Sequence, residues 1–461
     1  MNQDIFEKAS IPKAVATFAL PTVLSMLVVI IYNMADTFFV GQTGDPNQVA
    51  AVSLATPVFL LLMAFGNMFG IGGSTLISRK LGEKNTDQVK HISSFCFYGC
   101  IAVGLLLTAI FIIGMPLILQ LIGSSSDTAG YARDYLFYIG CGAVFIVTSN
   151  AFGNILRGEG AVKQSMFGMM LGTIVNIILD PIMILSMNMG VAGAAIATII
   201  GNICSIIYYV YYLLKKSSLL SISPKHFTLK DGIPAGVFVI GVPASINNIL
   251  MSMANILLNN YLASYGDVPV AAMGVAMKAN ILVVLLQMGL AMGIQPLVAY
   301  CFGSKNYSRM KNVMKFTIMC TITIGTVLTV VYLCFTRNII KGFIDNTAVI
   351  GYGISMLKAL MLSGPVLGIL FVFMFTFQAM GKAIPSLILS ISRQGLVFLP
   401  VLIISNSILG LNGIIWAQPI ADIISLVMAF LMFILLSRKM DLNAKEPVDT
   451  EMFDLGQENN A

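Results

Sequence analysis

Long apolar runs, separated by short polar or Gly/Pro-containing segments, extend along almost the entire chain. A transmembrane α-helix needs about 20 predominantly apolar residues, and twelve runs meet that requirement. The runs lack the period-two alternation of membrane β-barrel strands, so helices are the structure that satisfies their backbone groups in lipid. The predicted spans cover approximately residues 15–40, 50–78, 92–114, 131–156, 165–188, 191–214, 235–263, 270–300, 314–335, 352–378, 384–408 and 411–437. We therefore expect an all-α polytopic membrane protein with twelve transmembrane helices.

The composition strengthens this prediction and excludes several functional classes. Hydrophobic residues make up 57% of the chain and charged residues 10%, whereas soluble domains carry about a quarter charged residues. The two histidines, His91 and His226, lie outside the apolar body, which therefore has no histidine base for a catalytic triad. The sequence contains no Walker motif and no CxxC pair. We expect a protein that is not an enzyme and that holds no cofactor.

The lysines and arginines indicate the orientation in the membrane, because cytoplasmic loops carry an excess of both. If both termini are cytoplasmic, the cytoplasmic segments receive 20 of the 26 basic residues, and the outer loops receive Arg337 and Lys341. This distribution predicts a multi-pass protein of the cell membrane with both termini in the cytoplasm. Topology alone accounts for the basic loops, so we expect no nucleic-acid partner. We also expect the protein to be a monomer in the lipid bilayer.

The two halves of the chain resemble each other. LPTVLSMLVVIIYNMADTFFVGQTGD at 20–45 aligns with VPASINNILMSMANILLNNYLASYGD at 242–267, an offset of 222 residues. GVAGAAIATIIGN at 190–202 aligns with GLNGIIWAQPIAD at 410–422, an offset of 220. A steady offset across separated regions indicates duplication of a six-helix unit. We therefore expect two pseudo-symmetric six-helix bundles with a binding cavity between them.

The duplication and the polar segments together predict the organisation of the chain. We expect an N-terminal six-helix lobe over 1–214 and a cytoplasmic linker over 215–230. A C-terminal six-helix lobe over 231–440 follows, and the acidic tail at 441–461 is expected to be cytoplasmic and disordered.

Three acidic residues lie within predicted spans: Asp36, Asp180 and Asp422. A charge inside the bilayer costs about 2.5–3.5 kcal/mol on insertion scales, so each calls for an explanation. Asp36 aligns with Leu258 in the second half. A carboxylate needed only for the structure of the repeated unit would occur in both copies. The asymmetry favours a function performed by the first half alone over a structural ion pair.

Asp180 precedes Pro181, which frees a backbone carbonyl one turn earlier. Asn176 lies four residues before Asp180, so the two side chains share a helical face. Carboxylate, amide and carbonyl oxygens are the ligands that a hard cation prefers; the alternative is a polar cluster that holds helices together. Asp422 aligns with Asn202 and is equally compatible with a structural and a functional role.

The second half also carries basic residues within its predicted spans: Lys278, Lys358 and Arg393. None has an acid at helical spacing in its own helix, so each either extends toward the membrane surface or pairs across a cavity with an acid or a substrate. Methionines in the seventh and eighth spans are suited to lining an adaptable cavity. The candidates for substrate contact are Lys278, Met288, Arg393 and Asn255.

Several motifs, in order, resemble the MATE (multidrug and toxic compound extrusion) family. They are LPTVLSMLVVIIYNMADTFFVG at 20–41, GEKN at 82–85, NILRGEG at 154–160 and NIILDPIMI at 176–184. FQAMGKAIPSLILSISRQ at 377–394 is similar to the bacterial branch typified by the MepA multidrug exporters. The resemblance covers essentially the whole chain.

This resemblance implies a V-shaped pair of six-helix bundles that exports drugs in exchange for Na⁺ or H⁺. It also implies a coupling-ion site in the first lobe, and the matching positions here are Asp36, Asn176, Asp180 and Thr198. Some Na⁺-coupled relatives carry a carboxylate on the seventh helix, where this chain has asparagines, among them Asn255. We therefore expect one coupling site per chain.

The sequence thus predicts a secondary active antiporter that exports small organic molecules, often cationic, by alternating access. It leaves the choice between Na⁺ and H⁺ open. Two alternatives are a flippase for phosphorylated lipid precursors and a membrane receptor or channel without coupled export. Cavity arginines would favour the flippase, but the first half has none in the interior of its spans and the second has only Arg393.

Overall fold

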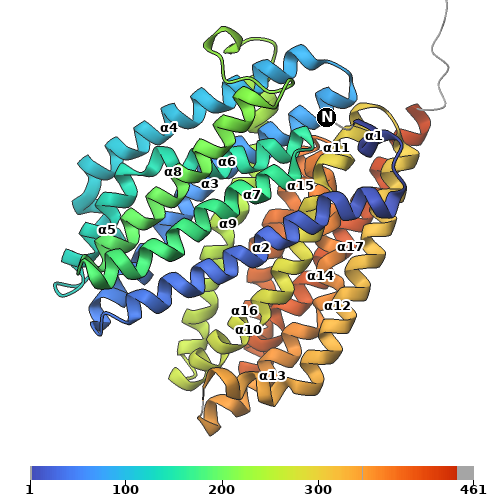
Figure 1. Ribbon diagram of the computed structural model, residues 1–461. Helices are drawn as coiled ribbons and strands as arrows, with labels where there is room; N and C mark the ends of the chain where they lie inside the picture. Colours follow the sequence, from blue (N-terminus) through green and yellow to red (C-terminus); the bar gives the residue numbers. More distant parts are fainter. Residues whose placement is uncertain (1–2, 345, 444–461) are drawn as a thin grey trace, which may run out of the picture.

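The computed structural model describes residues 3–344 and 346–443, which form helices joined by short connections (Figure 1). The first half contains α1 (Gln3–Glu7), α2 (Ile11–Gly41), α3 (Pro46–Gly82), α4 (Thr86–Leu121), α5 (Ala129–Cys141), α6 (Ala143–Glu159), α7 (Val162–Asp180), the π-helical η1 (Pro181–Ser186) and α8 (Gly190–Lys215). A short 3-10 helix, η2 (Pro224–His226), lies in the connection between the halves. The second half contains α9 (Ile233–Ala263), α10 (Asp267–Gly293), α11 (Gln295–Gly303), α12 (Tyr307–Phe343), α13 (Thr347–Leu362), α14 (Gly364–Ala379), α15 (Ala383–Ile391), the π-helical η3 (Ser392–Leu396), α16 (Phe398–Leu409) and α17 (Leu411–Asn443).

The predicted fold class is confirmed. Within the described residues, ten helical segments are long and apolar enough to cross a membrane, and counting each of two bent helix pairs as one span brings the number to twelve. The pairs are α5 with α6, bent by 57°, and α13 with α14, bent by 46°. Each pair is the fourth span of its half. No strand occurs among residues 3–344 and 346–443.

Local sequence explains both bends. Gly142 lies between α5 and α6, where an added Cβ would come within 2.4 Å of the Ile199 side chain, so the close approach requires glycine. Pro365 lies in the first turn of α14, a position where the missing N–H of proline is tolerated and a new helix can begin. The fourth spans are therefore broken at corresponding places by different residues.

The loops after the second and eighth spans have the same conformation, which supports the duplication. Lys84 and Lys305 both have left-handed backbones, with φ of 60° and 57°. Asn85 and Asn306 follow them, and each accepts a backbone N–H in the first turn of the next helix, at 3.2 and 3.0 Å. Asparagine is among the best residues for this capping position.

The two halves form two lobes that meet at one end and diverge toward the other (Figure 1). The first helix of each lobe packs against the other lobe, α2 against α10 and α9 against α3. Small residues permit these crossings: an added Cβ on Gly241 of α9 would lie 1.9 Å from the Met68 carbonyl oxygen of α3. On the opposite side, Gly289 of α10 lies against Val23 of α2.

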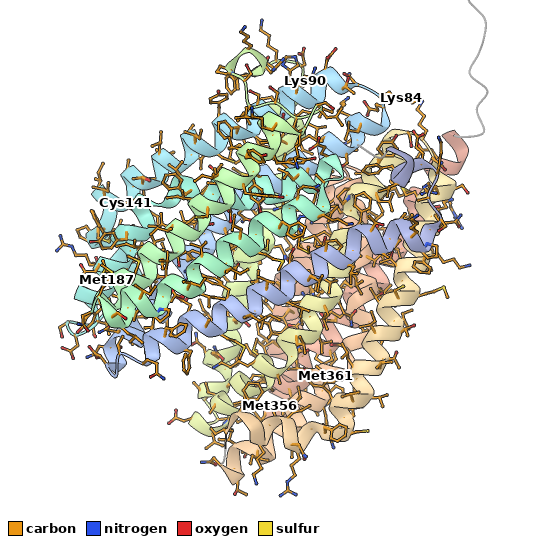
Figure 2. All side chains as sticks on the ribbon, viewed as in Figure 1. Lys84, Lys90, Cys141, Met187, Met356 and Met361 are labelled. Carbon is orange, nitrogen blue, oxygen red and sulfur yellow. The ribbon has the colours of Figure 1, made fainter. Side chains whose placement is uncertain are left out.

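We call the end where the lobes meet the closed end; it carries the loops at 83–85 and 304–306. An added Cβ on Gly82 would lie 2.2 Å from the Tyr300 carbonyl oxygen. The Arg79 guanidinium stacks over the Phe302 ring, 5.8 Å from its centroid. Figure 2 shows Lys84 near this end, with Met187 at the free end of the first lobe and Met356 toward that of the second.

Residues 3–9, which we call the N-terminal clasp, belong to the first half but dock on the second. Phe6 is buried between Phe18 and Tyr300, with ring centroids 5.0 and 4.5 Å away. The Tyr300 hydroxyl donates to Glu7 at 2.7 Å. Arg309 of α12 donates to two backbone carbonyls of the clasp, at 3.3 and 2.7 Å. The clasp thus ties the closed end together.

The predicted linker at 215–230 lies against α4. Ser93, Ser94 and Tyr98 of α4 each donate a hydrogen bond to a backbone carbonyl of the linker, at 2.9, 2.9 and 3.0 Å. The structure continues α17 to Asn443, so the predicted tail at 441–461 is described only at its first three residues, and the rest lies outside the described residues.

Candidate functional site

A buried polar cluster joins α7 and α8 inside the first lobe. Asp180, Asn176 and Thr198 are 0%, 2% and 4% exposed, so each must find its hydrogen-bond partners within the protein. In the amide orientation that satisfies both its oxygen and its nitrogen, Asn176 donates to Asp180 Oδ2 at 3.2 Å and accepts from the backbone N–H of Thr198 at 3.1 Å. Asn176 therefore links the carboxylate of one helix to the backbone of the next.

Pro181 explains the local backbone around Asp180. The α-helix ends at Asp180, and the chain continues as a π-helical turn that begins at the proline. Proline has no N–H to continue the helical ladder, and π-helical turns are frequent at functional sites. The sequence NIILDP therefore places Asp180 at a change of helix type.

Asp36 reaches the same region from α2. Tyr32, one turn earlier on that helix, forms a hydrogen bond of 3.2 Å with Thr198 Oγ1 and holds α2 against α8. The Asp36 and Asp180 carboxyl groups interact electrostatically, and both interact with the Tyr135 hydroxyl. Asp36 Oδ1 is buried and has no hydrogen-bond partner among the described residues. The four residues predicted as the coupling-ion site therefore lie in one neighbourhood.

The chemistry of this cluster suits a small cation or a proton. Two carboxylates, an amide oxygen and a hydroxyl are hard oxygen ligands of the kind Na⁺ and similar ions accept. Two neighbouring carboxylates in an apolar lobe repel each other and are poorly solvated, so binding one positive charge relieves both costs. Within the described residues, no group of three or more His, Cys, Asp or Glu is placed to hold a metal ion.

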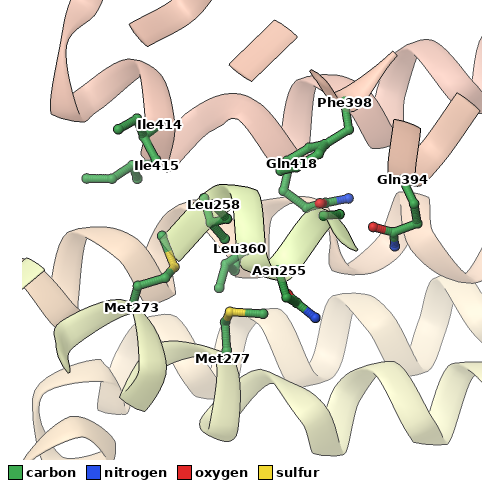
Figure 3. Close-up of a pocket in the computed structure, with 11 residues that line it drawn as sticks. Asn255, Leu258, Met273, Met277, Leu360, Gln394, Phe398, Ile414, Ile415 and Gln418 are labelled. Carbon is green, nitrogen blue, oxygen red and sulfur yellow. The ribbon is translucent and has the colours of Figure 1, made fainter. Parts of the chain in front are cut away.

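The second lobe has a cavity of about 40 Å³ at the corresponding place, between α9, α10, α16 and α17 (Figure 3). The repeat aligns Leu258 with Asp36 and Phe398 with Asn176, and both line this cavity. Its polar side is formed by Gln418, which aligns with Thr198, by Gln394 and by the predicted substrate contact Asn255. Among the described residues that line it, the counterpart of the first-lobe polar cluster therefore has no carboxylate.

The remaining substrate candidates differ in their surroundings. Arg393 donates from Nε to Asp422 at 3.0 Å, and its guanidinium lies 5.0 Å from the centre of the Phe371 ring. Its charge is thus balanced inside the second lobe. Met288 is partly buried and packs against the hydrophobic core. Lys278 is exposed, and it has no hydrogen bond or ion pair within the described residues.

Sequence reasoning missed Tyr32 and Tyr135, which lie beside the first-lobe polar cluster. Tyr32 carries one usable signal, since it lies four residues before Asp36 and so shares its helical face. Tyr135 offers none, because its approach to the carboxylates depends on how α5 packs.

Two pseudo-symmetric helical bundles, with a buried polar cluster in one of them, have the architecture of a secondary transporter. The MatE family model matches residues 21–182 and again 243–404, and the chain belongs to this family. The two matches differ by 222 residues, the same offset as the internal repeat.

The chain is also similar to named proteins over nearly its full length. It is 35% identical to the multidrug export protein MepA of Staphylococcus saprophyticus over 441 residues, which is 96% of this chain and 97% of that protein. It is 34% identical to MepA of Staphylococcus aureus over 444 residues, which is 96% and 98% of the two chains.

Solved structures share the fold. The structure of MATE in complex with MaL6 has a TM-score of 0.91 at 24% identity, covering 96% of this chain and 100% of that one. The outward-facing conformation of a multidrug resistance MATE family transporter of the MOP superfamily has a TM-score of 0.90 at 24% identity, covering 96% and 99%.

Proposed function

We propose that this protein is a secondary active antiporter that exports drugs and other organic compounds, often cationic, in exchange for Na⁺ or H⁺. The observation that carries the proposal is the buried cluster of Asp36, Asn176, Asp180 and Thr198 inside one of two lobes that diverge. Its relatives named as multidrug export proteins support the export of organic compounds.

The closed end faces the cytoplasm in this proposal. The loops at 83–85 and 304–306 lie there, and the segments around them are rich in lysine and arginine. The lobes then open toward the outside. Export requires this arrangement to alternate with the opposite one, in which the closed end is parted and the far ends of the lobes are together. The substrate is taken up from the cytoplasm in the second arrangement and released outside in the first.

The coupling step acts through α2, because this helix belongs to both parts of the machinery. Its outer half carries Tyr32 and Asp36 into the ion site, and its inner half packs with Val23 against α10 of the other lobe. Binding of a cation between Asp36 and Asp180 removes their repulsion and draws α2 toward α8. That movement changes the fit of α2 on α10, and so it favours one arrangement of the lobes over the other.

The same comparison of lobes supports the proposal of one coupling site per chain. The second-lobe cavity has Leu258 and Phe398 where the first lobe has Asp36 and Asn176. The flippase alternative would need several arginines in the cavity for a phosphate, and Arg393 is already neutralised by Asp422.

Efflux from proteoliposomes tests this function. An organic cation such as ethidium is loaded, and a Na⁺ gradient and then a pH gradient are imposed in separate experiments. We expect one of the two gradients to drive uphill transport, and Asp36→Asn to abolish it, because an amide cannot take up and release the charge. The matched control is Asp127→Asn, the same change at an exposed loop acid. Unimpaired gradient-driven transport by a well-folded Asp36→Asn variant would refute the assignment.

A further inference from the structure

One face of α10 runs along the boundary between the lobes. At the closed-end half of the helix, Gly289 and Gly293 lie against α2, where an added Cβ would approach the Cα atoms of Val23 and Ala19 to 3.0 and 2.5 Å. Lys278 precedes Gly289 by 11 residues, which is about three turns of an α-helix. Lys278 therefore lies on the same face of α10, about 16 Å further toward the diverging end of the lobes.

The same face is uncovered at that end. Ala271, Gly274, Lys278 and Ile281 follow one another at intervals of three and four residues, and all four are exposed. An added Cβ on Gly274 would meet nothing within 4 Å. Helix α2 covers this face of α10 at one end and leaves it open at the other. The open part therefore borders the space between the parted lobes. Figure 1 shows α10 beside α2, in agreement with their packing.

Lys278 brings an unbalanced positive charge to this wall. Asp422, the buried acid of the second lobe, is already engaged by Arg393 and Gln418, at 3.0 and 2.9 Å. Within the part of the chain that the structure describes, Lys278 itself has no ion pair or hydrogen bond. The first lobe has the opposite polarity, since its buried ionisable cluster contains two carboxylates, one of them Asp36. The space between the lobes thus has a cationic wall and a wall backed by acids.

We propose that the Lys278 ammonium binds an anionic group of the exported molecule, so that the preferred substrates are zwitterionic organic molecules with a carboxylate or phenolate opposite a basic amine. The inference rests on the proposed export function and narrows its substrate class. The anionic group lies against α10, and the basic group points toward the first lobe. A substrate with only a positive charge meets the ammonium without a counter-charge and binds more weakly.

A competing role for Lys278 is purely structural, with its aliphatic stem covering apolar surface and its ammonium reaching for water. Lys278→Met separates the two roles, because methionine keeps an unbranched stem and removes the charge. Lys278→Arg retains the charge and is the conservative variant. Lys341→Met is the matched control, since it removes a lysine from an exposed position near the end of α12.

The experiment uses two probes that differ only at the anionic group: the zwitterionic fluoroquinolone norfloxacin and its ethyl ester. Export of each is measured in proteoliposomes under the driving gradient, and binding of each is measured on the purified full-length protein by intrinsic fluorescence or calorimetry. A single charge-assisted contact in a partly wet site corresponds to about a threefold to tenfold change in affinity. We expect Lys278→Met to weaken norfloxacin binding and raise its KM by that factor, with the ester unchanged or improved.

The expected pattern also includes recovery by Lys278→Arg and no effect of Lys341→Met. Equal changes for norfloxacin and its ester in Lys278→Met would assign the lysine a structural role and overturn the inference. Binding and export of both probes at wild-type levels in Lys278→Met would overturn it as well. Failure of the wild-type protein to export either probe, or ethidium, under both gradients would instead refute the proposed function, and this inference with it.

Discussion

Asn176 offers the sharpest test of the ion site, because its side chain bridges two helices. Asn176→Ala removes the hydrogen bond to Asp180 Oδ2 and the bond from the Thr198 N–H. Hydrogen bonds to charged groups contribute about 1.5–3 kcal/mol, and the amide oxygen is itself a candidate ion ligand. We expect the coupling ion to bind about 10- to 100-fold more weakly, which corresponds to roughly 1.4–2.8 kcal/mol.

The affinity can be measured without transport. An ion that binds the folded protein raises its unfolding temperature in a concentration-dependent way, and this dependence yields the dissociation constant. The matched control is Asn202→Ala, which removes the same side chain one turn beyond Thr198, where the amide bonds only to a backbone carbonyl of its own helix. We expect the control to change ion affinity by less than about threefold.

A double-mutant cycle with Asp180→Asn completes the test. Residues in contact through a shared ligand show coupling energies of about 0.5–3 kcal/mol, so we expect the second substitution to cost much less once the first is present. Strictly additive losses for Asn176→Ala and Asp180→Asn would show that the two side chains do not serve one ion. An equal loss in Asn202→Ala would attribute the effect to general packing between α7 and α8.

Two further predictions concern the second lobe and the contact between lobes. Asp422→Asn removes the carboxylate that pairs with Arg393, whose side chain is only 12% exposed. We expect a loss of about 3 kcal/mol in stability, the lower end of the range for breaking a buried ion pair, measured as a lower unfolding temperature and largely reversed by adding Arg393→Met. A single variant as stable as the wild type would contradict the pair's structural role. Gly241→Leu places atoms where the Met68 carbonyl now lies, 1.9 Å from an added Cβ, so we expect spin labels on the two lobes to report a changed interlobe distance distribution. Gly114→Leu, at a position where an added Cβ meets only one atom, at 4.0 Å, should leave the distribution unchanged, and an unchanged distribution in Gly241→Leu would refute the argument.

The twelve spans could be predicted from sequence because the bilayer imposes one length and one polarity on every crossing segment. Hydropathy does not show that two spans are bent, since Gly142 and Pro365 break the helix direction without interrupting the apolar run. The repeat could be predicted as well, because segments such as 190–202 and 410–422 keep their register in the two halves. The spans and the repeat can be predicted because they depend on residues that are neighbours in the chain or that are separated by a fixed offset.

The candidate site was only partly accessible to the same reasoning. Asn176 and Asp180 are one turn apart on a single helix, so their association follows from spacing. Thr198 came from resemblance alone, and Tyr135 came from neither, because only packing brings it near. The partner of Arg393 could not be identified for the same reason, because Asp422 is 29 residues away on another helix.

The N-terminal clasp also has a consequence for biogenesis. Its residues leave the ribosome well before the side chains that receive them, because Tyr300 and Arg309 are 293 to 304 residues later in the chain. At translation speeds of about 5–20 residues per second, the clasp waits roughly 15–60 seconds for its docking surface. During that interval the face of α2 that carries Ala19 and Val23 has only lipid or the insertion machinery to cover it. The clasp can therefore pack only after the chain has been made as far as Arg309, when the second lobe begins to supply its docking surface.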